Sequence, residues 1–238
     1  MTFDTCHISF FILIPGSLEQ AILVKNHKFR TKLREAYDKY ALERESSALQ
    51  EWKIVERASF LSALQAENKK TLLEIGAGTG RDSKFFQDHG LKVICIDLSP
   101  AMIELCRQKG LTAYEMDMTG IDFSDNSFDA IYSLNSMLHL TKAEFPEILR
   151  RLDSLLKVDG LVYIGMYGGY DYEGIWDKDS YIPKRFFSFF ADVSLEQELL
   201  KIFDILSFKR IYREPIDPIH FQSLILKKRH SSNNGPKP

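Results

Sequence analysis

A short apolar run that ends in closely spaced glycines constrains this chain more than any other feature. Residues 71–75 read Thr-Leu-Leu-Glu-Ile, and Gly76, Gly78 and Gly80 follow at alternate positions. Glycine permits positive φ angles and leaves no Cβ between the backbone and a ligand. The pattern predicts a buried strand that turns sharply into a helix and forms a small-molecule platform at its carboxyl end.

Strand and helix patterns alternate from residue 71 onward, which predicts a mostly parallel sheet. Helices are expected from about Leu33, over 49–68 and over 195–206, and Gly110 and Gly160 are expected to end helices. The aromatic, charged stretch 168–190 is expected to be a loop. Strands are expected at 71–75, 92–97, 112–116, 128–134, 161–167, 208–213 and 220–226.

The length of 238 residues suits one or two domains, and no second boundary is visible in the composition. An apolar run at residues 8–14 lacks the charged start and cleavage site of a signal peptide. The predicted organisation is an extension of uncertain role over 1–24, one domain over 25–230 and a disordered tail over 231–238. Within the domain, residues 25–70 are helices, 71–167 the ligand-binding core and 168–230 a substrate-side loop with the last strands.

Charge and cysteine content narrow the function classes. The 31 basic and 33 acidic residues give a formal net charge of −2, which does not suit a general polyanion-binding surface. Cys6, Cys95 and Cys106 have neither disulfide-framework nor zinc-site spacing, so a reducing, cytoplasmic location without a metal is expected. No apolar run is long enough to span a membrane. Residues 25–34 are basic; we favour a solvated helix face, with a nucleic-acid arm as the alternative.

The acids around the glycines indicate the kind of ligand. Asp97 follows Gly80 by 17 positions, a distance at which an acid meets a ribose. The glycine spacing misses the dinucleotide pattern, in which two residues separate the second and third glycines. Glu74 stands just before the loop, where it would repel a phosphate and suit a cation. Together these residues predict an adenosine-type ligand with a positively charged group.

The segment Leu72–Gly80 resembles the first motif of class I S-adenosylmethionine-dependent methyltransferases. Val93–Met102, Asp117-Met118, Phe128–Asn135 and Leu155–Leu161 resemble later motifs of the same family. The resemblance covers about residues 71–167 in order and spacing. It implies an α/β fold of three layers, with a seven-stranded Rossmann-like sheet, an antiparallel late strand and helices on both faces.

The resemblance implies S-adenosylmethionine as the cofactor and S-adenosylhomocysteine as the product. Asp97 would bind the ribose hydroxyls and Asp117 the adenine amine, while Leu98 and Met118 would flank the adenine ring. The alternative for the two aspartates is that they cap turns. The cofactor-binding candidates are Glu74, Gly76, Ala77, Gly78, Gly80, Asp97, Leu98, Asp117, Met118, Leu134 and Asn135.

Methyl transfer from a sulfonium is an in-line displacement that depends mainly on alignment. An acceptor that must lose a proton also needs a base, for which His139 is the candidate; a structural histidine bonded to the backbone is the alternative. Tyr37, Tyr167 and Arg185 are the substrate-binding candidates. The aromatic residues that could cover the site, or simply fill the core, are Tyr37, Tyr40, Trp52, Tyr167, Tyr170, Tyr172, Trp176 and Phe186.

The residues after the fourth strand narrow the acceptor. Asn135–Leu138 replaces the Asn/Asp-Pro-Pro-Tyr/Phe tetrad typical of enzymes that methylate base amines, and no cysteine follows a proline there. The prediction is a methyltransferase, monomeric or homodimeric, that acts on a small molecule and binds neither nucleic acid nor membrane. The alternatives are an RNA or protein methyltransferase, a non-catalytic cofactor-binding module and, more remotely, a nicotinamide oxidoreductase.

Overall fold

The structure of the chain is a computed structural model that describes residues 18–212 and 219–229, with side chains from Lys28 onward. The apolar run at 8–14, Cys6 and the tail at 231–238 lie outside the described residues. Within the described part, none of the helices has the length and apolar character needed to cross a bilayer.

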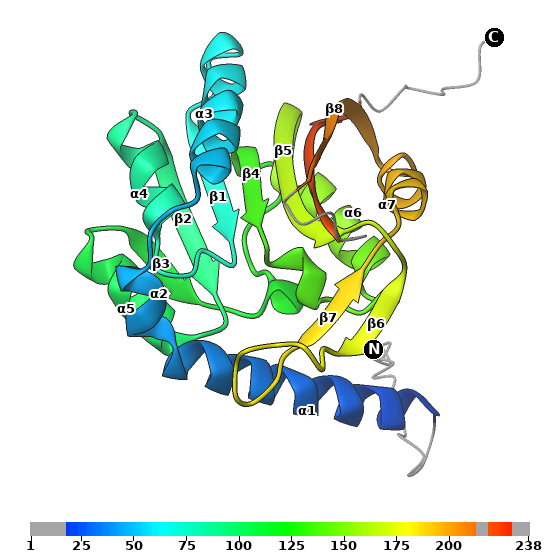
Figure 1. Cartoon of the computed structure of the whole chain (residues 1–238). Coiled ribbons are helices and arrows are strands. Elements are labelled where there is room, and N and C mark those ends of the chain that lie inside the picture. The colour runs from blue at the N-terminus through cyan, green and yellow to red at the C-terminus, as the bar shows by residue number, and fades with distance from the viewer. Residues whose placement is uncertain (1–17, 213–218, 230–238) are drawn as a thin grey trace, which may run out of the picture.

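A seven-stranded sheet in the order β3-β2-β1-β4-β5-β9-β8 forms the centre of the molecule (Figure 1). The first five strands in this order are parallel, whereas β9 is antiparallel to both β5 and β8. The predicted fold class is therefore confirmed. The strands are β1 Thr71–Ile75, β2 Lys92–Asp97, β3 Thr112–Glu115, β4 Phe128–Leu134, β5 Leu156–Gly168, β8 Phe203–Ile211 and β9 His220–Lys228.

Helices fill the connections between the parallel strands, except between β3 and β4, where a short 3-10 turn, η1 Met118–Gly120, is found. The start of α5 is encoded locally, because the Ser99 side chain accepts a hydrogen bond from the Met102 N–H and Pro100 occupies the first turn. The other elements are α1 Leu18–Lys39, α2 Ala41–Ser46, α3 Glu51–Ala66, α4 Arg81–Asp88, α5 Pro100–Gln108, η2 Met137–His139, α6 Phe145–Leu155 and α7 Asp192–Leu199.

Successive strand residues point to opposite faces of the sheet, and each face is covered by helices. Leu73 belongs to a buried cluster with residues of α6 and α7. Leu72 belongs to a second cluster with Phe60 of α3 and Phe86 of α4. The central strands therefore have two apolar faces, as a sheet buried between helix layers requires.

Two predicted elements near the end of the chain are wrong. The helix expected over 195–206 ends at Leu199, and β8 begins at Phe203, because Phe203 is fully buried and pairs with β9. The stretch 168–190 is not all loop: β6 Tyr172–Ile175 pairs with β7 Phe186–Phe189 in a two-stranded antiparallel sheet. In both cases, pairing with a strand that is distant in the sequence determines the secondary structure.

The end of α6 also differs from its prediction. The helix ends at Leu155, and Gly160, expected to cap it, lies inside β5. Asp159 holds the positive φ of +60° instead. Gly110, by contrast, has a φ of +74° just beyond α5, as a residue that ends a helix often does.

Helix α1 begins at Leu18, upstream of the expected domain start at residue 25, and lies at the side of the sheet toward which β1 and β4 point (Figure 1). The Asp38 carboxylate anchors it by accepting hydrogen bonds from the Ser99 hydroxyl (2.5 Å) and the Ala101 N–H (3.2 Å) at the start of α5. The Phe29 ring stacks on Phe186 of β7, with 4.4 Å between centroids. The helix thus spans from α5 to the β6–β7 sheet.

The burial of α6 predicts a large difference between two leucine truncations. Leu149→Ala removes a fully buried side chain, so it should lower the free energy of unfolding by about 2–5 kcal/mol. Leu42→Ala removes a side chain that is 75% exposed and should change it by less than about 0.5 kcal/mol. Urea denaturation measures both, and equal effects would contradict this packing.

Candidate functional site

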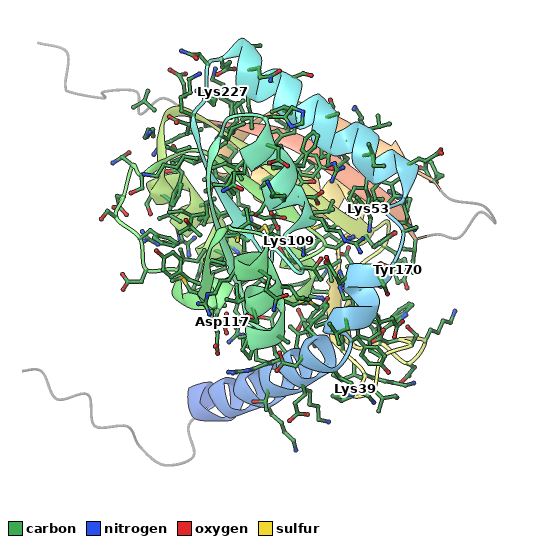
Figure 2. All side chains as sticks on the ribbon, turned by 90° about the vertical axis from the view of Figure 1, so that its left-hand side faces the viewer. Lys39, Lys53, Lys109, Asp117, Tyr170 and Lys227 are labelled. Atoms are coloured by element: carbon green, nitrogen blue, oxygen red, sulfur yellow. The ribbon has the colours of Figure 1, made fainter. Side chains whose placement is uncertain are left out.

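Two adjoining cavities lie at the edge of the sheet where β1, β2 and β4 end. The inner cavity is bordered by residues after β2 and β3, including Asp97, Leu98, Asp117 and Met118. The outer cavity has a volume of about 620 Å³ and reaches Lys53 of α3. Figure 2 shows Asp117 next to α1, with Lys227 near the opposite edge of the molecule. The residues that line both cavities are Tyr37, Arg44, Gly76, Gly78, Leu134, Asn135 and His139.

The structure brings nearly all of the predicted site residues to these two cavities. Tyr167 and Arg185, two substrate-binding candidates, line the outer cavity, as do Glu74 and Ala77. Gly80 is the exception, since it lines neither cavity and packs against α5 instead. A group of three or more metal-ligating side chains is not found among the described residues.

The three glycines of the loop have different physical roles. A Cβ at Gly76 would lie 2.2 Å from the Ser136 Cβ, and a Cβ at Gly80 would lie 2.7 Å from the Leu111 Cδ1. Packing within the protein therefore requires these two glycines. Gly78 has a φ of +54°, and a Cβ there would meet no protein atom within 4 Å. Gly78 is the glycine that leaves open space for a ligand.

Asp97 and Asp117 border the inner cavity and also stabilise local turns. The Asp97 carboxylate accepts hydrogen bonds from the Gly78 N–H (2.8 Å) and the Ser99 N–H (2.9 Å), while burial raises its pKa. The Asp117 carboxylate accepts from the Thr119 N–H at 2.8 Å and pairs with the Arg30 guanidinium at 3.2 Å. Asp97 thus connects the glycine loop to the end of β2, and Asp117 connects the inner cavity to α1.

Glu74 is the most buried acid of the outer cavity. Burial and the negative charge of Asp82 raise its pKa well above the usual range, and the Ser83 hydroxyl donates a hydrogen bond to it. Burial also raises the pKa of Asp82, although Arg57 pairs with it at 2.9 Å. Ionising both of these neighbouring carboxyls is unfavourable, so a positively charged group beside them would stabilise their charged forms.

Tyr37 of α1 and His139 of η2 form a hydrogen-bonded pair at the junction of the cavities. The His139 Nδ1 lies 2.7 Å from the Phe186 carbonyl oxygen, so Nδ1–H donates to it and Nε2 accepts. The Tyr37 hydroxyl lies 2.7 Å from Nε2 and donates to it. Burial lowers the pKa of His139 to about 3, so the imidazole is neutral at physiological pH. His139 therefore makes the backbone hydrogen bond expected of a structural histidine, and it also bonds to Tyr37.

Arg185 is placed at the outer cavity, but an acid already pairs with it. Its Nη2 and Nε donate to the Asp179 carboxylate at 2.7 Å and 3.0 Å, and its Nη1 donates to the Tyr37 hydroxyl at 3.1 Å. The guanidinium also lies over the Tyr181 ring, 3.8 Å from its centroid. We infer that Arg185 positions Tyr37 and Tyr181, rather than serving as an open anion site.

The predicted aromatic cover divides into two groups. Tyr40 stacks on Tyr181 at 4.2 Å, beside Tyr37, so this group covers the outer cavity. Trp52 instead packs on Phe221 at 4.3 Å and Trp176 packs on Phe189 at 5.1 Å, and both tryptophans are half-buried and line neither cavity. Sequence reasoning missed Arg44, Asp179 and Tyr181. The density of charged and aromatic residues in 168–190 marks the last two, but no local pattern marks Arg44.

Comparison with known proteins agrees with this geometry. Residues 72–160 match the family model described as a methyltransferase domain. The biotin biosynthesis bifunctional protein BioHC of Cellvibrio japonicus is 31% identical over 47% of this chain and 22% of its own length. Phosphoethanolamine N-methyltransferase 2 of Caenorhabditis elegans is 29% identical over 67% of this chain and 37% of its own length. The chain thus spans half or less of the length of the curated relatives it matches first.

Solved structures share the fold. The 1,6-didemethyltoxoflavin-N1-methyltransferase of Burkholderia thailandensis, solved with its substrate and S-adenosylhomocysteine, aligns with a TM-score of 0.67 and 19% identity. The alignment covers 86% of this chain and 91% of that protein. The family match and the strand order agree with each other: residues 72–160 match a methyltransferase domain, and the chain has the Rossmann-like fold of solved S-adenosylmethionine-dependent methyltransferases.

Proposed function

We propose that this protein transfers a methyl group from S-adenosylmethionine to a small-molecule acceptor. One observation carries the proposal: the open glycine Gly78, the acid Asp97 and the Tyr37–His139 pair all border the same two adjoining cavities. A cofactor platform and a proton-accepting pair therefore lie next to each other.

The residues present fit the cofactor. Gly78 leaves space for a ligand close to the backbone, and Asp97 offers a carboxylate at the end of β2. Leu98 and Met118 supply apolar side chains to the same inner cavity. When bound, the cofactor would supply a methyl group on a positively charged sulfur, and the Glu74 carboxyl of the outer cavity, which no cation contacts within the described residues, suits its positive end.

The Tyr37–His139 pair can take a proton from the acceptor. The Tyr37 oxygen would receive the proton of an N–H, O–H or S–H nucleophile while its own proton moves to the His139 Nε2, 2.7 Å away. Because the pKa of His139 is about 3, the imidazole would hold this proton only transiently and then release it to solvent. The Arg185 Nη1 donates to the Tyr37 oxygen at 3.1 Å and so keeps this oxygen in place beside His139. In this arrangement Tyr37 is the group that touches the acceptor, and His139 acts through it.

A small acceptor fits better than a nucleic acid. Two arginines of the basic segment 25–34 already have acidic partners: Arg30 pairs with Asp117 and Glu144, and Arg34 pairs with Glu115. Several curated relatives carry the names of small acceptors, since they are phosphoethanolamine and demethylmenaquinone methyltransferases. Labelled methyl groups that appear in RNA or protein would favour a macromolecular acceptor, and cofactor binding without any transfer would favour a non-catalytic module.

The open space at Gly78 predicts that adding a single side-chain carbon there weakens cofactor binding. Gly78→Ala should weaken S-adenosylhomocysteine binding at least about tenfold, because its Cβ occupies the ligand's space. Gly90→Ala is the matched control, since Gly90 also has a positive φ (+88°) and open surroundings but lies away from the cavities. Calorimetry measures both affinities. Absence of binding to the unaltered protein would refute the proposed cofactor.

The proposed proton transfer from the acceptor through Tyr37 to His139, here called the relay, predicts the same loss of activity in two variants. Tyr37→Phe and His139→Gln should each slow methyl transfer by about 100-fold to about 10,000-fold while S-adenosylhomocysteine affinity stays within about threefold. The double variant should be no slower than the slower single variant, because the two groups act as one unit. The assay follows labelled methyl transfer into the small-molecule fraction of a cell extract. Unchanged rates in both variants would exclude the relay.

The buried, neutral His139 predicts a pH-dependent stability. Its pKa is lowered from 6.5 to about 3 in the folded protein, so below pH 6.5 protons bind the unfolded chain preferentially. Lowering the pH from about 7 to about 5 should therefore cost about 2 kcal/mol of unfolding free energy through this residue. His139→Gln should lose that component and show the smaller pH dependence. Urea denaturation at both pH values tests this, and equal pH dependence in the two proteins would contradict it.

A further inference from the structure

The basic side chains of the outer cavity differ in how their charges are compensated. The Arg185 guanidinium is held by two hydrogen bonds to the Asp179 carboxylate, at 2.7 Å and 3.0 Å. The Arg81 guanidinium donates to the backbone carbonyls of Ser47 (2.7 Å) and Arg44 (2.6 Å). These two arginines have structural partners that a ligand would have to displace.

The Arg44 side chain is different. Its Nη1 donates to the Tyr181 hydroxyl at 3.2 Å, and its guanidinium lies 5.3 Å from the centroid of the Tyr37 ring. It is half-buried, it borders both cavities, and within the described residues it forms no ion pair. The nearby Asp97 carboxylate is occupied by two backbone N–H groups. Arg44 and Asp97 attract each other without direct contact, since the Arg44 charge favours the ionised Asp97 carboxylate. A partly buried guanidinium without a direct ion pair still costs free energy, which a bound anion would offset.

Tyr181 provides a second donor beside Arg44. Its ring is fixed between Tyr40, stacked at 4.2 Å, and the Arg185 guanidinium, 3.8 Å from its centroid. Its oxygen accepts from Arg44, and no acceptor for its hydroxyl hydrogen occurs in the part of the chain that the structure describes. The guanidinium and this hydroxyl are thus adjacent donors at one cavity. Adjacent donors of this kind suit the oxygens of a carboxylate or phosphate.

We propose that the methyl acceptor is an anionic small molecule whose acid group binds Arg44 and Tyr181. The inference rests on the methyl transfer proposed above. S-Adenosylmethionine carries a sulfonium, an ammonium and one carboxylate, so its net charge is positive. Bringing it next to a guanidinium that forms no direct ion pair is unfavourable, and an anionic acceptor would offset this repulsion. The acid group thereby selects the substrate and orients its nucleophile toward Tyr37.

The experiment titrates an acid probe into protein saturated with S-adenosylhomocysteine. Inorganic phosphate and acetate, each followed by calorimetry, represent the two acid types. We expect one of them to bind, and Arg44→Gln to weaken that binding at least about tenfold, the usual effect of losing a charge-assisted hydrogen bond. Tyr181→Phe keeps the ring and should weaken it less. Arg34→Gln is the control, because Arg34 is an exposed arginine that pairs with Glu115 and lines neither cavity.

Three results would overturn the proposal. In the first, neither acid binds the saturated protein. In the second, Arg44→Gln binds the acid as well as the unaltered protein does. In the third, Arg44→Gln weakens S-adenosylhomocysteine binding tenfold or more while 5′-methylthioadenosine, which lacks the amino-acid part, binds as before. Arg44 would then hold the cofactor's own carboxylate. Absence of S-adenosylhomocysteine binding to the unaltered protein refutes the methyl-transfer proposal instead, and acid binding to the free protein still tests Arg44.

Discussion

The close approach of the chain at the ends of β1 and β4 is the constraint on which the site depends. Gly76 can carry no side chain there, because a Cβ would lie 2.2 Å from that of Ser136. The Ser136 hydroxyl donates to the Ile75 carbonyl at 2.7 Å and shares a second hydrogen bond with Ser133. These contacts fix the glycine loop against the segment that carries Asn135 and His139. The ligand platform and the histidine therefore have one geometry relative to each other.

Helix α1 completes the site from outside the sheet. Two adjacent residues of this helix make contacts with different elements. The Asp38 carboxylate accepts a hydrogen bond from Ser99 at the start of α5, whereas the Tyr37 hydroxyl bonds to His139. Arg30, two turns earlier, pairs with Asp117 at the inner cavity. A helix that precedes the glycine loop in sequence thus supplies one wall of both cavities, through side chains that are held at three points along its length.

Local signals account for the parts of the fold that the sequence predicts. The five parallel strands were predictable because apolar runs, glycines and the Ser99-Pro100 helix start are all encoded within a few residues. The start of β8 was not, because Ile202, Phe203, Ile205 and Leu206 suit either a helix face or a strand, and pairing with β9 decides. The Arg44–Tyr181 contact joins residues 137 positions apart, so no local pattern encodes it.

The strand order also determines when the sheet can be completed during synthesis. β9 follows β8 in the chain yet lies between β5 and β8 (Figure 1). As a nascent chain emerges, β1 to β5 can pair as soon as each parallel neighbour is present, whereas β8 has no place in the sheet until β9 has been made. The glycine loop and His139 thus belong to the half that can form first. The antiparallel pair β8–β9 is added beside β5 later, and this step requires strands far apart in the chain to pair.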